Sequence, residues 1–220
     1  ALGWPGCDFL GTDIDAEQLD GAACNARLLG TGRPGGAVSL ARADARALPL
    51  PSGSVDALVC DIPFGIQYLS VEACRAGFYD DIFREFDRVV SPTCGCHAGG
   101  GCCRPGGGDF GSGGGRLVVL SSLEQEPWVL KAAGLPSTAP GAGVPARPPW
   151  FCVARRELKL NTLDTVVLAL RRPRCGESAS ADLPPLSKRL WWETNAGRGD
   201  WSNLKVSIRP PMQLARGREI

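Results

Sequence analysis

Apolar positions along the chain follow two periods, which predict alternating strands and helices. Apolar residues at helical spacing run through Ala16–Leu29 and Val71–Val90, and a weaker helical pattern covers Glu124–Ala133. Short apolar runs typical of buried strands lie at Cys7–Thr12, Ala37–Leu40, Val55–Val59 and Arg116–Leu120. Strands that alternate with helices in this way indicate an α/β fold with a mostly parallel sheet.

Two later strand patterns break this alternation. Phe151–Leu160 and Asp164–Leu170 are joined only by a short turn that contains Asn161 and Thr162. Parallel strands need a long crossover, so a connection this short makes the pair antiparallel. The sequence therefore predicts a parallel sheet that finishes with an antiparallel hairpin.

Three aspartates come just after successive predicted strands. Asp13, Asp44 and Asp61 each follow the carboxyl end of one strand. Because parallel strands end at one edge of the sheet, where ligands bind in open α/β folds, we expect the three acids to line one site. Such a set suits a nucleoside, with one acid for ribose hydroxyls, one for an adenine amino group and one near the reacting atoms. Taken singly, each aspartate also fits a helix start or a turn.

The stretch Asp61–Gly65 reads Asp-Ile-Pro-Phe-Gly. The Asp61 side chain and the Ile62 carbonyl are suited to accept the two hydrogens of an exocyclic amine on a flat base. That would turn the nitrogen lone pair toward an electrophile, while Phe64 would stack on the ring. A strand-ending turn is the plainer alternative, because proline and glycine commonly end strands.

Composition narrows the class of protein. The net charge is +1, so there is no overall electrostatic reason to expect nucleic acid, and any basic surface must be local. No stretch reaches the roughly 18 unbroken apolar residues of a membrane helix, and no basic-then-apolar leader opens the sequence. Several of the 10 cysteines occupy apolar strand or helix positions, as free thiols do. We therefore expect a reduced, intracellular protein without a membrane segment.

Glycine and proline mark the expected domain organisation. Residues 1–172 are the α/β domain, with a Gly/Cys-rich insertion at 93–115 and a Pro/Gly loop at 135–149, and residues 173–220 are a linker and a tail containing Trp and Arg. The candidate metal ligands of the insertion are Cys94, Cys96, His97, Cys102 and Cys103. Their cramped spacing differs from the paired Cys-x-x-Cys motifs of structural zinc sites. We therefore favour a low-complexity segment and assign no metal site, with a zinc-binding interaction protein as an alternative.

Together these motifs resemble the catalytic domain of the THUMP-domain-containing RNA guanine-N2 methyltransferases, which are class I S-adenosylmethionine-dependent enzymes. The resemblance covers Phe9 to Arg172. Its segments are Gly11–Asp15, Ala23–Ala26, Leu48–Leu50, Ser54–Asp56, Cys60–Gly65, Arg88–Pro92 and Gly115–Leu120. Cys60–Gly65 is the most specific, because it is close to the Asp-Leu-Pro-Phe-Gly type of the eukaryotic subgroup. The implied fold is a Rossmann-like sheet, mostly parallel, with a C-terminal antiparallel hairpin.

The resemblance implies that S-adenosylmethionine is the cofactor. Asp13 and Ile14 would contact its ribose side, and Asp44 with the Ala45 backbone would hold its adenine. The family's first strand and Gly-rich cofactor loop lie upstream of the strand that ends at Asp13, and Gly3–Gly6 does not replace them. We therefore expect a sheet that lacks its first strand, and a chain that by itself binds S-adenosylmethionine weakly or not at all.

The resemblance also implies methyl transfer to guanine N2 of a tRNA or a small nuclear RNA. The residues expected to hold the target base are Asp61, Pro63 and Phe64 as catalytic residues, with Ile62, Phe64 and Gly65 as base contacts. A small zinc-binding activator subunit is the implied protein partner, and the cytoplasm or nucleus is the implied location. Two alternatives stay open: methyl transfer to adenine N6, and a truncated, non-catalytic chain that acts as a binding module.

Overall fold

The computed structural model of the chain describes residues 7–28, 38–66, 68–91, 114–143, 149–173 and 183–187. The Cys/His tract at 94–103 lies outside these residues, as do most of the tail after 173 and part of the predicted Pro/Gly loop. In the described ranges, no helix is both long enough and apolar enough to cross a membrane.

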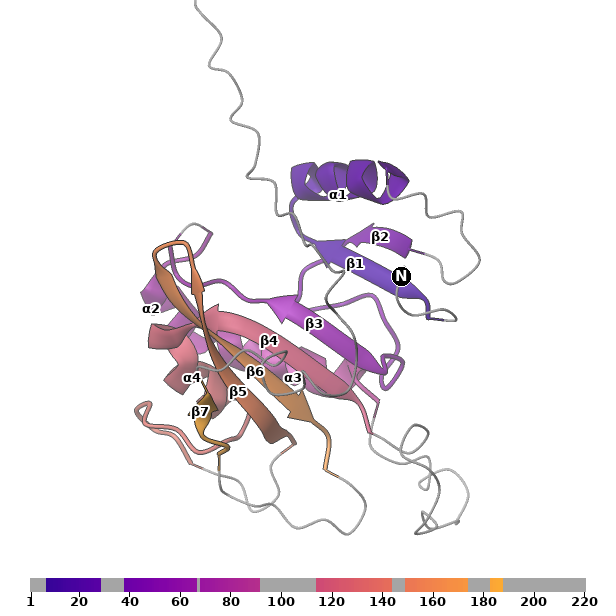
Figure 1. The fold of residues 1–220 in the computed structure, drawn as a ribbon. Coiled ribbons are helices and arrows are strands. Elements are labelled where there is room, and N and C mark those ends of the chain that lie inside the picture. The colour runs from indigo at the N-terminus through magenta and orange to yellow at the C-terminus, as the bar shows by residue number, and fades with distance from the viewer. Residues whose placement is uncertain are drawn as a thin grey trace, which may run out of the picture. The chain divides into compact units, whose positions relative to one another are not determined.

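Elements from the first two described ranges form a small β–α–β layer (Figure 1). Strand β1 (Phe9–Asp13) pairs in parallel with β2 (Val38–Arg42), and helix α1 (Ala16–Leu28) contacts both strands. The helix begins where predicted, because the Asp15 carboxylate accepts a hydrogen bond from the Glu17 amide at 2.8 Å. None of the described residues of this layer is fully buried. The layer therefore contributes little to the hydrophobic core.

A five-stranded sheet in the order β3-β4-β6-β5-β7 forms the main body. Its strands are β3 (Ala57–Asp61), β4 (Arg116–Ser122), β5 (Phe151–Leu160), β6 (Leu163–Arg171) and β7 (Leu186–Ser187). Strands β3 and β4 are parallel, whereas β6 runs antiparallel to both β4 and β5. The predicted hairpin is therefore confirmed. The short strand β7, which pairs in parallel with β5, is not predicted by the sequence pattern.

Strand pairing is divided between two sheets. Within the described residues, β1 pairs only with β2, and β3 pairs only with β4. On β3, Val59 is 80 % exposed, although parallel strands are ordinarily covered on both faces. The α/β fold class, with parallel strand pairs and an antiparallel hairpin, is confirmed.

The helix predicted over 71–90 is present but is kinked at Gly77, whose φ of 133° and ψ of −10° are not helical. It runs through α2 (Val71–Ala73), the π-helical turn η1 (Cys74–Phe78) and α3 (Tyr79–Val89). Its start is capped by Ser70, whose hydroxyl accepts a hydrogen bond from the Ala73 amide at 3.2 Å. The buried side chains of the helix are Cys74, Tyr79, Ile82, Phe83, Glu85, Phe86 and Val89. Of the apolar residues at helical spacing, Cys74, Ile82, Phe86 and Val89 are thus buried, and Phe78 is half-buried.

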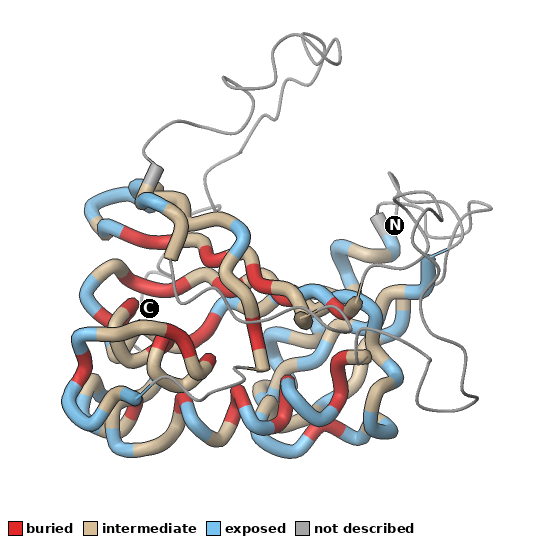
Figure 2. The backbone as a smooth tube through the Cα atoms, turned by 90° about the horizontal axis from the view of Figure 1, so that it is seen from below, coloured by how far each residue is buried: buried red, intermediate tan, exposed pale blue. Residues whose placement is uncertain are grey.

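The hydrophobic core is built from the five-stranded sheet and the helices α3 and α4 (Glu126–Ala132), and Figure 2 marks its buried positions. Helix α4 follows β4 directly, after the single 3₁₀ turn η3 (Leu123–Gln125). Side chains with at most 2 % exposure in this core include Phe83, Phe86, Leu117, Val119, Val129, Trp150, Val166 and Leu168. This packing holds the carboxyl ends of β3 and β4 close to the long helix.

Candidate active site

The loop that follows Asp61 is anchored from two sides. The Ile62 amide donates a hydrogen bond to the Leu120 carbonyl of β4 at 3.1 Å, and Ile62 is only 2 % exposed. The Tyr79 hydroxyl donates to the Pro63 carbonyl at 2.8 Å. The loop is therefore fixed at Ile62 and Pro63, while Asp61 keeps an exposed surface at the end of β3.

The Asp61 carboxyl group is a hydrogen-bond acceptor in a partly desolvated position. Desolvation raises its pKa above the ordinary aspartate value, although part of the residue remains exposed. The carboxylate form is consequently lost at a higher pH than usual as the solution is acidified. The neighbouring Cys60 thiol has its pKa raised to about 12, first by burial and then by the charge of Asp61. Because that thiol stays protonated at neutral pH, the site is suited to hydrogen bonding rather than to attack by a thiolate.

Gly65 ends the motif in a backbone conformation that other residues adopt with strain. Its φ is +85°, and an added Cβ would lie 2.6 Å from Cγ2 and 2.9 Å from Cα of Val71. Glycine is the residue that tolerates both conditions. The last position of the motif therefore lets the chain turn from β3 toward α2.

Replacing Gly65 by alanine should lower the free energy of unfolding by about 1–3 kcal/mol, because the positive φ and the contact with Val71 both oppose a Cβ. Gly21→Ala is the matched control, since Gly21 lies inside α1 with no heavy atom within 4 Å of an added Cβ. There alanine should add about 0.5–1 kcal/mol. Urea unfolding of both variants measures the two changes. A Gly65→Ala variant as stable as the wild-type chain would contradict the strained geometry.

Asp13 and Ile14 lie at the carboxyl end of β1. One carboxylate oxygen of Asp13 accepts the Asp15 amide at 2.8 Å, and the Asp13 carbonyl accepts the Ala43 amide at 2.9 Å. Within the described residues, the other carboxylate oxygen has no hydrogen-bond partner. Ile14 is 58 % exposed beside it. The pair therefore offers one free acceptor and one apolar surface, which suits a ribose and its attached base.

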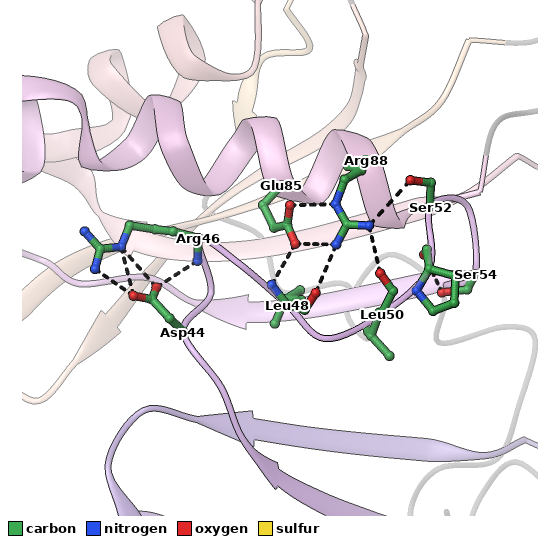
Figure 3. Close-up of polar contacts among 9 residues, drawn as sticks. Asp44, Arg46, Leu48, Leu50, Ser52, Ser54, Glu85 and Arg88 are labelled. Carbon is green, nitrogen blue, oxygen red and sulfur yellow. Dashed lines mark hydrogen bonds and ion pairs between the residues drawn. The ribbon is translucent and has the colours of Figure 1, made fainter.

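Asp44 lies just beyond β2, next to Ala45, but its carboxylate is already engaged (Figure 3). It accepts hydrogen bonds from Arg46 Nε at 3.0 and 3.1 Å, from Nη2 at 2.6 Å and from the Arg46 amide at 2.9 Å. The side-chain hydrogen bond from Arg46 is the main cause that lowers the pKa of Asp44. The same guanidinium lies 5.7 Å from the centroid of the Phe78 ring. Binding of an adenine amino group by Asp44 therefore requires the half-exposed Arg46 side chain to move or to share the carboxylate.

The connection between β2 and β3 is fastened to α3 by an ion pair between the buried Glu85 and the more exposed Arg88 (Figure 3). Glu85 accepts the Leu48 amide at 2.7 Å and Arg88 Nη2 at 2.6 Å. Arg88 in turn donates to the carbonyls of Leu48 at 3.0 Å and Leu50 at 2.7 Å. Glu85 is 8 % exposed, and its pKa is lowered mainly by the side-chain hydrogen bond from Arg88. The fastening fixes the chain that runs from the Asp44 region into β3.

The structure places all three aspartates at or just beyond strand ends, as the pattern predicts. It brings Asp13 and Asp44 to the same end of the β1–β2 layer, whereas Asp61 ends a strand of the other sheet. Sequence reasoning missed Arg46 and Tyr79, the residues that hold Asp44 and the Pro63 carbonyl. An available signal for Tyr79 was the glycine two residues before it, because glycine inside a helical pattern marks a special turn. No comparable signal pointed to Arg46.

No group of three or more His, Cys, Asp or Glu side chains arranged to hold a metal ion occurs in the described part of the chain. The Cys/His tract at 94–103 lies outside that part, so what the sequence indicates for it stays a prediction. The described cysteines are free thiols: Cys7, Cys24, Cys60, Cys74 and Cys152.

Comparison with known proteins connects this site to a family. Residues 5–98 match the family described as the RMKL-like methyltransferase domain. The matched stretch includes the β1–β2 layer, strand β3 and the complete Asp61–Gly65 motif. The residues proposed above for the base and the nucleoside therefore all lie inside it.

Two curated relatives carry the name U6 snRNA (guanine-N(2))-methyltransferase THUMPD2. The Bos taurus protein is 38 % identical over 65 residues, which are 30 % of this chain and 12 % of that protein. The Mus musculus protein is 38 % identical over 88 residues, which are 40 % of this chain and 15 % of that protein. The chain thus spans less than a sixth of the length of each relative.

Among solved structures, a SAM-dependent methyltransferase from Methanosarcina mazei is similar at 16 % identity with a TM-score of 0.43, covering 75 % of this chain and 82 % of that one. A likeness this distant carries no argument about function. The family match and the curated relatives do confirm the resemblance seen in the sequence. Residues 5–98 of this chain match the RMKL-like methyltransferase domain family, and part of the chain is similar to proteins named as guanine-N2 RNA methyltransferases.

Proposed function

We propose that this chain carries the target-base site of an S-adenosylmethionine-dependent RNA methyltransferase that modifies guanine N2. The observation that carries the proposal is the anchored loop Asp61–Gly65 at the carboxyl end of β3. Within the described residues the Ile62 carbonyl accepts no hydrogen bond, so this carbonyl and the Asp61 carboxylate are available as a pair of acceptors. The methyltransferase family match and the guanine-N2 relatives support the reaction type.

An acceptor pair of this kind suits an exocyclic amine, which has two hydrogens to donate. Holding both hydrogens turns the N2 lone pair toward the methyl donor. S-adenosylmethionine supplies a methyl group on a positively charged sulfur, so the new N–C bond forms as the C–S bond breaks. Positive charge grows on N2 during this step, and hydrogen bonds to Asp61 and Ile62 therefore strengthen in the transition state. The amine then loses one proton to water, and no covalent bond to the protein is needed.

Phe64 completes the base site as a stacking surface. It is half-buried, and it follows Pro63, the residue whose carbonyl is held by Tyr79. In a base-paired RNA helix the guanine amine is held within the base pair. The target base must therefore be unpaired or flipped out before it reaches these residues. The proposed substrate is therefore a single-stranded or locally opened RNA segment.

The described residues provide some of the contacts that the nucleoside portion of the cofactor needs. Asp13 offers a free carboxylate oxygen for ribose hydroxyls, and Ile14 offers an exposed apolar surface for adenine. Asp44 and the Ala45 backbone would hold the adenine edge once Arg46 has shifted. We assign these four residues to the cofactor, with Asp44 as the position where binding requires a rearrangement.

The relatives' names favour a small nuclear RNA as the substrate class, with tRNA as the alternative that the sequence left open. A nuclear location follows from that substrate. The small zinc-binding activator subunit stays a prediction that rests on the resemblance alone.

Mass analysis of labelled nucleosides tests the proposal. The natural protein that contains these residues is incubated with U6 snRNA or tRNA and with methyl-labelled S-adenosylmethionine, and the RNA is then digested. N2-methylguanosine is the expected product. Label found only in N6-methyladenosine would assign the site to the other exocyclic amine. Absence of label from every nucleoside would favour a non-catalytic binding module.

A further inference from the structure

The π-helical turn η1 contacts both halves of the candidate site. Its last residue, Phe78, lies against the Arg46 guanidinium that holds the adenine-side carboxylate. The next residue, Tyr79, donates its hydroxyl hydrogen to the Pro63 carbonyl at 2.8 Å. The Cys74 thiol, at the start of the turn, lies 3.8 Å from the same oxygen. One turn of helix thus reaches the cofactor side and the target-base side together.

A kink at Gly77 precedes Tyr79, the first residue of α3. Each residue of an α-helix advances the rotation by about 100°, so a break in the helical backbone changes the direction of the side chains that follow. Gly77 makes this break with a φ of 133° and a ψ of −10°, which are not helical. Tyr79 is 2 % exposed, and its ring packs edge-on against Phe78 with 6.2 Å between centroids. The residue that follows the kink is thus buried with its hydroxyl on the Pro63 carbonyl.

We propose that Tyr79 is a positioning residue for methyl transfer, whose hydroxyl fixes the Pro63 peptide and thereby holds the Ile62 carbonyl and the Phe64 ring in place for the target guanine. The inference rests on the function proposed above. The Pro63 carbonyl belongs to the peptide that leads into Phe64, so rotation of that peptide would displace the stacking ring. Rotation of the preceding peptide would displace the Ile62 carbonyl. Displacements of about 1 Å at such positions cost up to about 10²-fold in rate.

The Tyr79 hydroxyl is suited to this role over a wide pH range. Burial is the main cause that raises its pKa, and the contact with Cys74 adds to the effect. The hydroxyl therefore stays protonated and keeps donating to the Pro63 carbonyl throughout the physiological range. Without this donor, the half-buried Pro63 carbonyl would lack a hydrogen bond of normal length from the described residues, since the Cys74 thiol is a weak donor at 3.8 Å.

Tyr79→Phe tests the inference, because it keeps the buried ring and removes only the hydroxyl. Tyr68→Phe is the matched control, since Tyr68 is the only other tyrosine of the chain and is 74 % exposed. The first readout, which needs no substrate, is hydrogen exchange of the Ile62 amide compared with that of Leu168 in the core. The second is the kcat and KM of RNA methylation by the natural protein that contains these residues.

In Tyr79→Phe we expect the Ile62 amide to exchange on the order of tenfold faster while Leu168 is unchanged. We expect kcat to fall on the order of tenfold with KM for S-adenosylmethionine unchanged. Tyr68→Phe should alter neither readout. A wild-type kcat in Tyr79→Phe would overturn the inference, and so would equal acceleration of Ile62 and Leu168, which would mean general destabilisation. A wild-type protein that methylates no RNA would overturn the proposed function and the catalytic role with it, whereas selective acceleration at Ile62 would still support fixing of the loop.

Discussion

Replacing Asp61 by alanine should reduce methyl transfer to guanine N2 by about 10²–10³-fold or more, with the fold retained. The substitution removes the acceptor whose hydrogen bond strengthens as positive charge grows on the amine, and it leaves the Ile62 carbonyl alone to orient the base. The backbone anchors of the loop at Ile62 and Pro63 are unaffected. Incorporation of labelled methyl groups into RNA by the natural protein measures the effect.

Asp56→Ala is the control for this experiment. Asp56 is an exposed aspartate just before β3, at the end of the strand opposite to Asp61, and its backbone bond to Arg116 survives the substitution. The Asp56→Ala variant should methylate RNA at close to the wild-type rate. Near wild-type methylation by Asp61→Ala would contradict the assignment of Asp61, and an equal loss in both variants would point to a disturbed strand rather than to a lost acceptor.

The second large effect is expected on stability, at Glu85. Glu85→Ala should lower the free energy of unfolding by about 1–3 kcal/mol, because it leaves the buried Leu48 amide without its acceptor and removes the ion pair with Arg88. The lowered pKa of Glu85 sets the pH range of this contribution. The stabilisation is complete above the unfolded-state pKa, and it is lost as the pH falls through the lowered folded-state pKa. Urea unfolding at neutral pH measures the loss.

Asp81→Ala is the matched control for Glu85→Ala. Asp81 pairs with Arg84 in the same helix and with the same three-residue spacing, but both side chains are about half exposed or more. Such a pair contributes about 0–1 kcal/mol. If both alanine variants lost the same stability, the Leu48–Glu85–Arg88 contacts would not be what fastens the connection between β2 and β3.

The strand and helix pattern predicted much of the fold, because burial imposes a period on the side chains. The hairpin of β5 and β6 followed from the short turn at Asn161, which is too short for a parallel crossover. The strand-end aspartates followed from apolar runs that stop at an acid. Both kinds of inference use information that lies within a few residues in the sequence.

The contacts that fix the site could not be predicted from these local patterns. Arg46 could bind any nearby acid, and only the structure shows that it occupies the Asp44 carboxylate. The helix is kinked at Gly77, where the spacing of the apolar residues stays nearly constant, so periodicity alone cannot distinguish this kink from an ordinary glycine in a helix. Tyr79 and Pro63 are separated by 16 positions, so their contact depends on how the helix packs under β3.

Replacement of guanosine by inosine in the RNA tests most directly whether the loop Asp61–Gly65 presents its acceptors to the guanine amine. Inosine has the same ring and the same other edges but lacks the exocyclic N2 group. The natural protein that contains these residues would be given methyl-labelled S-adenosylmethionine and the same RNA transcribed with guanosine or with inosine. We expect label in the guanosine RNA and none in the inosine RNA. Equal labelling of the two RNAs would contradict the account.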